Sequence, residues 1–147
     1  MRGLLVLLLC GVAWLPVQAQ EAPLMVEGAI TVNVLQAKYL YDRGALFIDI
    51  RPSREWGWGH VRGAMHLELA DQFGALARPH WPRQMPLVIY CDSEVCPQSA
   101  LAAHLAVSWG YLQVFYFRDG FFAWQLLDFP LGKGQEGEIP FISEAEH

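Results

Sequence analysis

The sequence predicts a single α/β domain in which a central, mostly parallel β-sheet is flanked by helices on both faces. Short apolar runs, suited to buried strands, alternate along the chain with stretches of helical spacing, as in proteins with parallel sheets. The chain has 147 residues, of which 54 % are hydrophobic and 13 % aromatic, so it can bury one proper core. We expect the folded domain to span residues 30–131.

The N-terminus is predicted to be a signal peptide, residues 1–19, rather than part of the fold. Arg2 supplies a positive charge, residues 4–15 are apolar, and Val17-Gln18-Ala19 has the small residues of a cleavage site. We expect cleavage after Ala19, export to the periplasm and no membrane association of the mature protein. A retained anchor is the less favoured alternative, because the apolar stretch is short for a transmembrane span.

The first half of the mature chain predicts a lead-in, a helix and a strand. Residues 20–29 are expected to be an extended lead-in. Asn33 is a typical helix N-cap, and the helix that follows should end before Gly44. Residues 45–50 predict a buried strand.

Charged residues gather at the end of that strand. Asp49 and Arg51 lie there, with Glu55 close by. We favour a structural clamp, in which Arg51 pairs with Asp49 or Glu55, over a catalytic role for these groups.

Residues 55–64 hold three glycines and two tryptophans, which predicts a tightly turning segment that is not a helix. His60 lies within it and could act as a general base, because histidine side chains suit proton transfer near neutral pH. We favour a histidine that hydrogen-bonds the backbone and pins the segment.

The second half continues the alternation of helices and strands. The predicted elements are a short helix within 67–78, a buried strand at 87–90, a helix from Pro97 to Trp109, a strand within 112–117 and a helix at 121–127. Residues 132–147 are polar and acidic, and predict a loosely ordered tail.

Cys91 lies where the strand at 87–90 stops, before the turn into the next helix. Ligands of open α/β sheets bind at the carboxyl ends of strands, where backbone N–H groups and a helix N-terminus would stabilise a thiolate. A buried thiol that only fills space is the alternative reading of this position.

Removal of the signal peptide leaves two cysteines, Cys91 and Cys96, in an exported protein. An oxidising compartment allows a disulfide between them, and their short spacing makes it a local redox pair rather than a staple across the fold. These two thiols and His104 do not make a tetrahedral ligand set, so no metal site is expected, and no cofactor is expected either.

The charge balance excludes other classes of function. The formal net charge is -5, with no basic cluster and no glycine-rich phosphate-binding motif. We expect no nucleic-acid partner.

The sequence resembles a single rhodanese domain over residues 30–131. Four segments carry the resemblance in the family's order and spacing: Asp49-Ile50-Arg51, Glu55 with Gly59-His60-Val61-Arg62-Gly63-Ala64, Tyr90-Cys91, and Gly110-Tyr111 with Asp119-Gly120 and Trp124. Each segment alone is weakly specific, but together they are specific.

This resemblance implies sulfur transfer with Cys91 as the catalytic nucleophile. The cysteine would attack a small sulfane-sulfur donor, such as thiosulfate or a mercaptopyruvate, and hold the sulfur as a persulfide before passing it to a thiol or cyanide. The substrate-binding loop would consist of Asp92, Ser93, Glu94, Val95 and Cys96.

The loop departs from the family pattern. It is longer than in small sulfurtransferases and has no arginine or lysine, offering Asp92 and Glu94 instead. These carboxylates should raise the pKa of the thiol and repel a dianionic donor. Asp119 adds a further carboxylate near the rim of the loop. Arg118 could compensate for this charge, but the sequence alone does not show where its side chain lies.

Two alternatives to simple sulfur transfer remain, and a third is excluded. A phosphatase is set aside, because Pro97 stands where such a loop would end in arginine. Cys96 could resolve a persulfide on Cys91, which would make the protein a periplasmic thiol–disulfide or persulfide relay. The domain could also be a catalytically inactive module that binds a periplasmic protein through exposed aromatic side chains.

Overall fold

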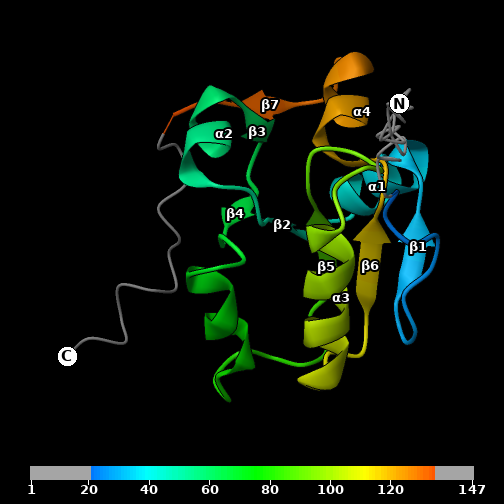
Figure 1. Ribbon diagram of the computed structural model, residues 1–147, viewed down its shortest axis with the longest axis vertical. Helices are drawn as coiled ribbons and strands as arrows, with labels where there is room; N and C mark the ends of the chain where they lie inside the picture. The colour runs from blue at the N-terminus through cyan, green and yellow to red at the C-terminus, as the bar shows by residue number, and fades with distance from the viewer. Residues whose placement is uncertain (1–20, 135–147) are drawn as a thin grey trace, which may run out of the picture.

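The structure, a computed structural model, describes residues 21–134. The predicted signal peptide and all but the start of the predicted tail lie outside these residues. A five-stranded sheet with the strand order β1-β6-β5-β2-β4 forms the centre, and all its strands are parallel (Figure 1). The predicted α/β class with a central parallel sheet is therefore confirmed.

The elements follow one another in the order that the alternating pattern predicts, with some additions. They are β1 (Ile30–Val32), α1 (Val34–Asp42), β2 (Leu46–Asp49), α2 (Ser53–Trp58), β3 (His60–Val61), β4 (Met65–His66), the 3-10 helix η1 (Gln72–Ala77), β5 (Leu87–Tyr90), α3 (Gln98–Ser108), β6 (Val114–Phe117), α4 (Gly120–Leu126) and β7 (Leu131–Gly132).

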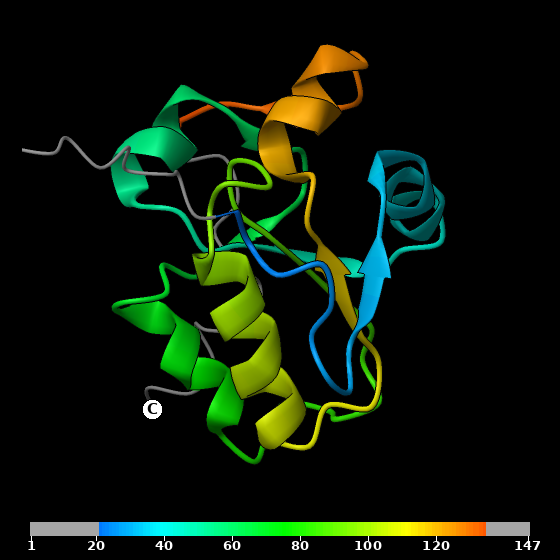
Figure 2. The ribbon, with the colours of Figure 1, turned by 45° about the vertical axis from the view of Figure 1, so that its right-hand side comes forward.

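Hydrophobic cores lie on both faces of the sheet because successive side chains of β5 point to opposite faces. Leu87 and Ile89 pack with residues of α3 and η1, whereas Val88 and Tyr90 pack with residues of α1, α2 and α4. Figure 2 shows α3 on one side of the sheet and α1 on the other. Both cores meet at β5, which is paired with a strand on each side.

The helix α1 begins at the predicted cap. Asn33 Oδ1 accepts a hydrogen bond from Gln36 N at 2.9 Å, and Gln36 Oε1 accepts one from Asn33 N at 2.8 Å. This reciprocal capping box satisfies two backbone groups that the first turn leaves unpaired. After the helix, Gly44 adopts a left-handed φ of +83°, which ends the element as expected.

The prediction that residues 55–64 contain no helix is wrong, since Ser53–Trp58 form α2. Gly57 lies inside this helix, where glycine costs about 1 kcal/mol relative to alanine. Trp56, which is buried, outweighs that cost by packing in the core and stacking on His60, with ring centroids 3.4 Å apart. The segment turns only at Gly59, after the helix.

Other differences concern short elements. Residues 67–78 form a 3-10 helix over only part of their length, and the strands β1, β3, β4 and β7 are too short to leave a periodic signal. Gly132, which the sequence assigns to the tail, pairs with His60 in a two-stranded antiparallel sheet.

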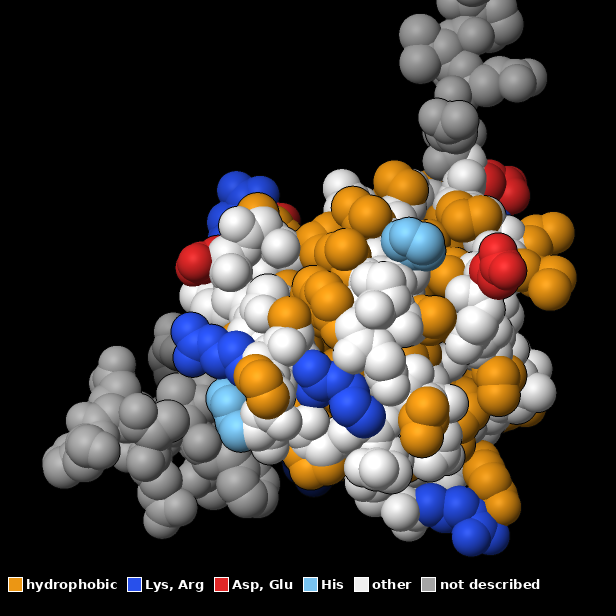
Figure 3. Space-filling model, turned by 90° about the horizontal axis from the view of Figure 1, so that it is seen from below, with side chains coloured by type: hydrophobic (Ala, Val, Ile, Leu, Met, Phe, Trp, Pro, Cys, Tyr) orange, Lys and Arg blue, Asp and Glu red, His pale blue; other side chains and the backbone are white. Residues whose placement is uncertain are grey.

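Within residues 21–134, none of the helices is both long and apolar enough to cross a membrane. Figure 3 shows the end of the molecule opposite the carboxyl edge of the main sheet. On that face the positively charged side chains stand apart from one another rather than in one cluster.

Candidate active site

Cys91 directly follows β5, at the carboxyl edge of the central sheet. The chain then makes a loop over residues 91–97 and enters α3 at Gln98. This loop lies between α2 and α4 (Figure 1). The Cys91 residue is buried, with 5 % of its surface exposed, whereas Cys96 is half-buried.

Cys91 and Cys96 form a disulfide, and their Cα atoms are 6.2 Å apart. The local redox pair that the spacing allows is thus joined in this structure. Cys91 is no nucleophile in this state, and only reduction frees its thiol. Gln98 Oε1 lies 2.8 Å from Cys96 Sγ, a contact that becomes a hydrogen bond when the reduced thiol carries a proton.

The loop is fastened to the start of α4 by its backbone. Cys91 O accepts a hydrogen bond from Phe121 N at 2.9 Å, and Asp92 O accepts one from Phe122 N at 3.0 Å. Gly120 makes this approach possible, because its φ is +72° and a Cβ atom there would lie 2.6 Å from Cys91 O.

Arg51 brings a positive charge to the loop from outside it. Its Nη1 donates to Asp92 Oδ1 at 3.2 Å, while its Nη2 donates to Asp49 Oδ2 and to Gly59 O, both at 2.7 Å. Burial lowers the pKa of the guanidinium, but the hydrogen bonds and charge of Asp49 outweigh it and leave the pKa raised. Arg51 therefore stays charged and pairs with both Asp49 and Asp92, so it offsets part of the negative charge that Asp92 brings to the loop.

Asp49 is also held by Tyr90, the last residue of β5. Tyr90 Oη donates to Asp49 Oδ2 at 2.6 Å and accepts a hydrogen bond from Val61 N at 3.1 Å. Burial and the nearby negative charge of Asp49 raise the Tyr90 pKa well above its usual range. The strand that carries Cys91 is thus fixed to β2 by a buried polar network as well as by its ladder.

His60 and Glu55 make different contacts from those of Arg51. His60 is buried, and its Nδ1 lies 2.9 Å from Trp56 O while its ring stacks on the indole of Trp56. Glu55 approaches Arg54 at 3.5 Å rather than pairing with Arg51. Among the described residues, Glu55 Oε2 is buried without a hydrogen-bond partner.

The tip of the loop is a tight turn in which Cys96 N donates to Ser93 O at 3.0 Å. Glu94 and Val95 are exposed at this tip. Within residues 21–134, the backbone N–H groups of Asp92, Ser93 and Glu94 donate to no other protein group. Successive free amides in a turn form a concavity suited to anions.

The lead-in reaches the same loop, a contact that the sequence analysis missed. Ala22 is buried, and its N–H donates to Glu94 O at 2.7 Å. Arg118 Nη2 donates in turn to Ala22 O at 3.0 Å and approaches Glu21 at 3.4 Å. Arg118 therefore supports the loop through the lead-in. No local sequence pattern could have indicated these contacts, because their partners lie far apart in the chain.

Asp119 does not add a free carboxylate to the rim of the loop. Its Oδ2 accepts a hydrogen bond from Val34 N, the first residue of α1, at 3.1 Å. An anion at a helix N-terminus is stabilised by the helix dipole and the free amides there.

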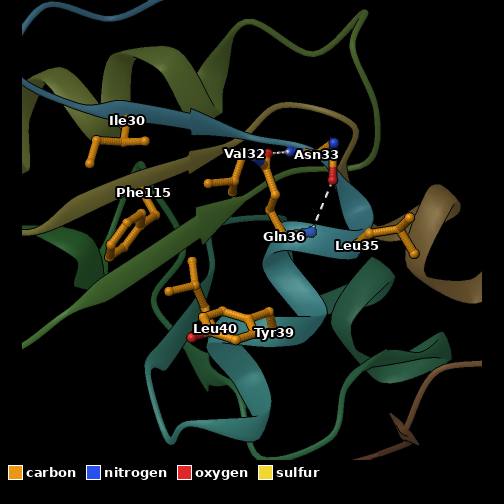
Figure 4. A pocket seen from close by; sticks show the side chains of 8 residues that line it. All are labelled: Ile30, Val32, Asn33, Leu35, Gln36, Tyr39, Leu40 and Phe115. Carbon is orange, nitrogen blue, oxygen red and sulfur yellow. Dashed lines mark hydrogen bonds between the residues drawn. The ribbon is translucent and has the colours of Figure 1, made fainter.

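A groove of about 440 Å³ lies apart from the loop, against β1, β6 and α1 (Figure 4). Its lining is mostly apolar and contains none of the predicted site residues. The lining residues are Ile30, Val32, Asn33, Leu35, Gln36, Tyr39, Leu40 and Phe115. Over residues 21–134, no group of three or more His, Cys, Asp or Glu side chains is arranged to hold a metal ion.

Known proteins share this sequence pattern and fold. Residues 33–127 match the family model of the rhodanese-like domain. The chain is 32 % identical over 107 residues to the thiosulfate sulfurtransferase GlpE of Ectopseudomonas mendocina, covering 73 % of this chain and 94 % of that protein.

Solved structures show the same fold at lower identity. The rhodanese-like domain of the Alr3790 protein from Anabaena superposes with a TM-score of 0.62 at 20 % identity, over 75 % of this chain and 83 % of that one. The polysulfide-sulfur transferase of Wolinella succinogenes gives a TM-score of 0.61 at 17 % identity, over 77 % and 85 %. Sequence and fold agree, and the chain belongs to the rhodanese-like domain family.

Proposed function

We propose that this protein is a sulfurtransferase in which Cys91, once reduced, carries sulfane sulfur as a persulfide. The observation that carries the proposal is the placement of Cys91 at the carboxyl end of β5, next to a turn with three free amides. Similarity to curated thiosulfate sulfurtransferases supports the same reaction class.

The transfer would proceed in two displacements. The Cys91 thiolate attacks the sulfane sulfur of a small donor, a Cys91 S–S bond forms, and the donor leaves with the electron pair of its broken bond. With thiosulfate the leaving group is sulfite. A thiolate or cyanide then attacks the outer sulfur and releases the Cys91 thiolate again.

The surroundings of the loop favour a modestly charged donor. The amides of Asp92, Ser93 and Glu94 can bind an anion, and Arg51 offsets part of the charge of Asp92. The exposed Glu94 opposes a dianion, because two like charges near one another repel. We place the reaction in the periplasm, following the signal-peptide prediction, with a thiol or cyanide as the acceptor.

A second candidate is a thiol–disulfide relay that moves electrons without moving sulfur. The Cys91–Cys96 disulfide favours it, because a dithiol partner could reduce this bond and reoxidise elsewhere. Such a relay needs both cysteines, whereas persulfide formation needs only Cys91.

Intact mass of the protein separates these functions. The reduced protein is freed of reductant and exposed to thiosulfate or mercaptopyruvate, with Cys91→Ser and Cys96→Ser treated alongside. We expect Cys96→Ser to gain one sulfur atom and Cys91→Ser to gain none. If Cys96→Ser gains no sulfur from either donor, the sulfurtransferase proposal fails. Disulfide formation alone in the unsubstituted protein would then indicate the relay, and no change of mass would indicate a binding module.

A further inference from the structure

We propose that Cys96 resolves the Cys91 persulfide and expels its outer sulfur as sulfide, so that the protein turns sulfane sulfur into free sulfide at the expense of an external thiol. This inference rests on the proposed persulfide on Cys91. It adds a second activity to the same loop, in which Cys96 is a catalytic residue rather than a part of the substrate-binding turn.

The disulfide shows which atom Cys96 can reach. In a persulfide the inner sulfur is Cys91 Sγ, and this is the atom to which Cys96 is bonded in the structure. An attack on the inner sulfur expels the outer one, whereas an attack on the outer sulfur would only move the persulfide. The loop geometry therefore selects release over transfer.

The reaction balances without a further co-reactant. The Cys96 thiol attacks Cys91 Sγ, a Cys91–Cys96 bond forms, the bond to the outer sulfur breaks, and hydrogensulfide leaves with the electron pair and the thiol proton. The Cys96 sulfur is oxidised to the disulfide level, at which the Cys91 sulfur already stands in the persulfide, and the outer sulfur is reduced to sulfide.

Both sulfurs are attached to well-fixed backbone. Cys91 ends β5 and its carbonyl is bonded to Phe121 N, while Cys96 closes a turn onto Ser93 and precedes α3. Holding the two reacting groups together makes the step intramolecular, which raises its rate far above that of a free thiol.

The disulfide must then be reduced by an external thiol, and exposure decides where that thiol attacks. Cys96 is half-buried and Cys91 is buried. A thiol therefore attacks Cys96, forms a mixed disulfide there and frees the Cys91 thiolate for the next donor. A second thiol, from the same dithiol or from another molecule, releases Cys96.

A single-turnover experiment tests this inference. The protein is reduced, freed of reductant without air, and mixed with one equivalent of thiosulfate carrying an isotopic label in its sulfane sulfur. We expect labelled sulfide in an amount close to that of the protein, together with the mass of the disulfide form. Cys96→Ser and Cys96→Ala should instead keep a stable labelled persulfide and release sulfide only when glutathione or dithiothreitol is added.

Two outcomes overturn the inference, and they differ. If the Cys96 variants take up sulfur but the unsubstituted protein also keeps its persulfide and releases no sulfide, Cys96 does not resolve it while the proposed function stands. If the Cys96 variants take up no sulfur from thiosulfate or, in a parallel run, from mercaptopyruvate, the persulfide itself fails and the inference falls with it. Trapping with glutathione disulfide gives a further check, since Cys91→Ser should exchange with it to form a mixed disulfide at Cys96, releasing one reduced glutathione, more readily than Cys96→Ser does at Cys91.

Discussion

Two acidic residues of the loop differ in what surrounds them. Asp92 is bonded to Arg51, whose charge is secured by Asp49, whereas Glu94 is exposed at the tip of the turn. Within residues 21–134, Glu94 is therefore the carboxylate of the loop that has no ion-pair partner. Asp92 and Glu94, which look equivalent in the sequence, therefore have different electrostatic surroundings.

Glu94→Gln is expected to raise kcat/KM for thiosulfate by roughly three- to ten-fold, because like charges near a protein surface interact by about 1 kcal/mol. The gain should shrink at high salt, which screens exposed charges. Steady-state assays with thiosulfate at low and high ionic strength check this. Asp92→Asn is the matched control and should give a smaller gain, since it also breaks the ion pair with Arg51 that holds the loop. An equal gain in both variants would contradict the assignment.

Tyr90 makes stability depend on alkaline pH. Its pKa is raised in the folded protein by burial and by Asp49, so above about pH 10 the unfolded chain loses a proton that the folded chain keeps. The stabilisation that arises from this pKa difference is complete below about pH 10. As the pH rises further, the free energy of unfolding falls by about 1.4 kcal/mol per pH unit. Urea denaturation from pH 8 to 11 measures it. Tyr90→Phe should be less stable overall, but its free energy of unfolding should fall less steeply with pH. An unchanged slope of this pH dependence would exclude Tyr90 as its source.

At the scale of elements, the loop after β5 depends on parts of the chain far from it in sequence. The start of α4 bonds its backbone from one side, and the lead-in reaches its tip at Glu94 from another. Residues 91–97 hold their shape through these neighbours.

Gly120→Ala tests the contact with α4, and Gly44→Ala is its matched control. Both glycines have a left-handed φ, but only at Gly120 would a Cβ atom meet backbone, whereas nothing lies within 4 Å at Gly44. We expect Gly44→Ala to cost about 1–2 kcal/mol of unfolding free energy and Gly120→Ala clearly more, with lost sulfur uptake by Cys91. Denaturation and mass measurements check this. Equal costs at both positions would show that the loop yields easily.

Arg118→Gln tests the contact with the lead-in. The change removes the guanidinium that bonds Ala22 O, so the Ala22 amide should open more often and exchange its hydrogen faster. We expect a several-fold faster exchange at Ala22, with the amides of β5 unaffected. Arg43→Gln, on the exposed end of α1, is the control. Unchanged exchange at Ala22 would mean that Arg118 does not hold the lead-in in place.

The central elements could be predicted from sequence, because their signals are local. The apolar run of β5, the Asn33 cap and the resemblance around Cys91 each occupy a few neighbouring residues. The contacts of Arg51 with Asp92 and of Ala22 with Glu94 could not be predicted, since they join segments far apart in the chain. The helix at Trp56 was missed because packing outweighed the glycines around it.

At the scale of the whole molecule, the two hydrophobic cores rather than the disulfide hold the fold together. The cores lie on opposite faces of the sheet and meet at β5. The Cys91–Cys96 bond closes only a short loop at one edge. Oxidised and reduced protein should therefore share one fold.

Reduction is expected to lower the free energy of unfolding by at most about 2 kcal/mol, the chain-entropy value for so short a loop. Urea denaturation with and without dithiothreitol measures the difference, and Cys96→Ser should match the reduced protein. Loss of the folded state on reduction would contradict this view and would leave no folded, reduced form to begin the reaction.

The role proposed for the Cys91–Cys96 bond also implies what would limit turnover of the protein. If each turnover ends in this bond, the protein comes to rest in the form described here, and supplying more sulfur donor does not restart it. The rate of sulfide release then depends on how fast external thiols reduce the disulfide at Cys96, and not on the concentration of sulfur donor. In an oxidising compartment, the rate of sulfide release would therefore report the supply of reducing thiols.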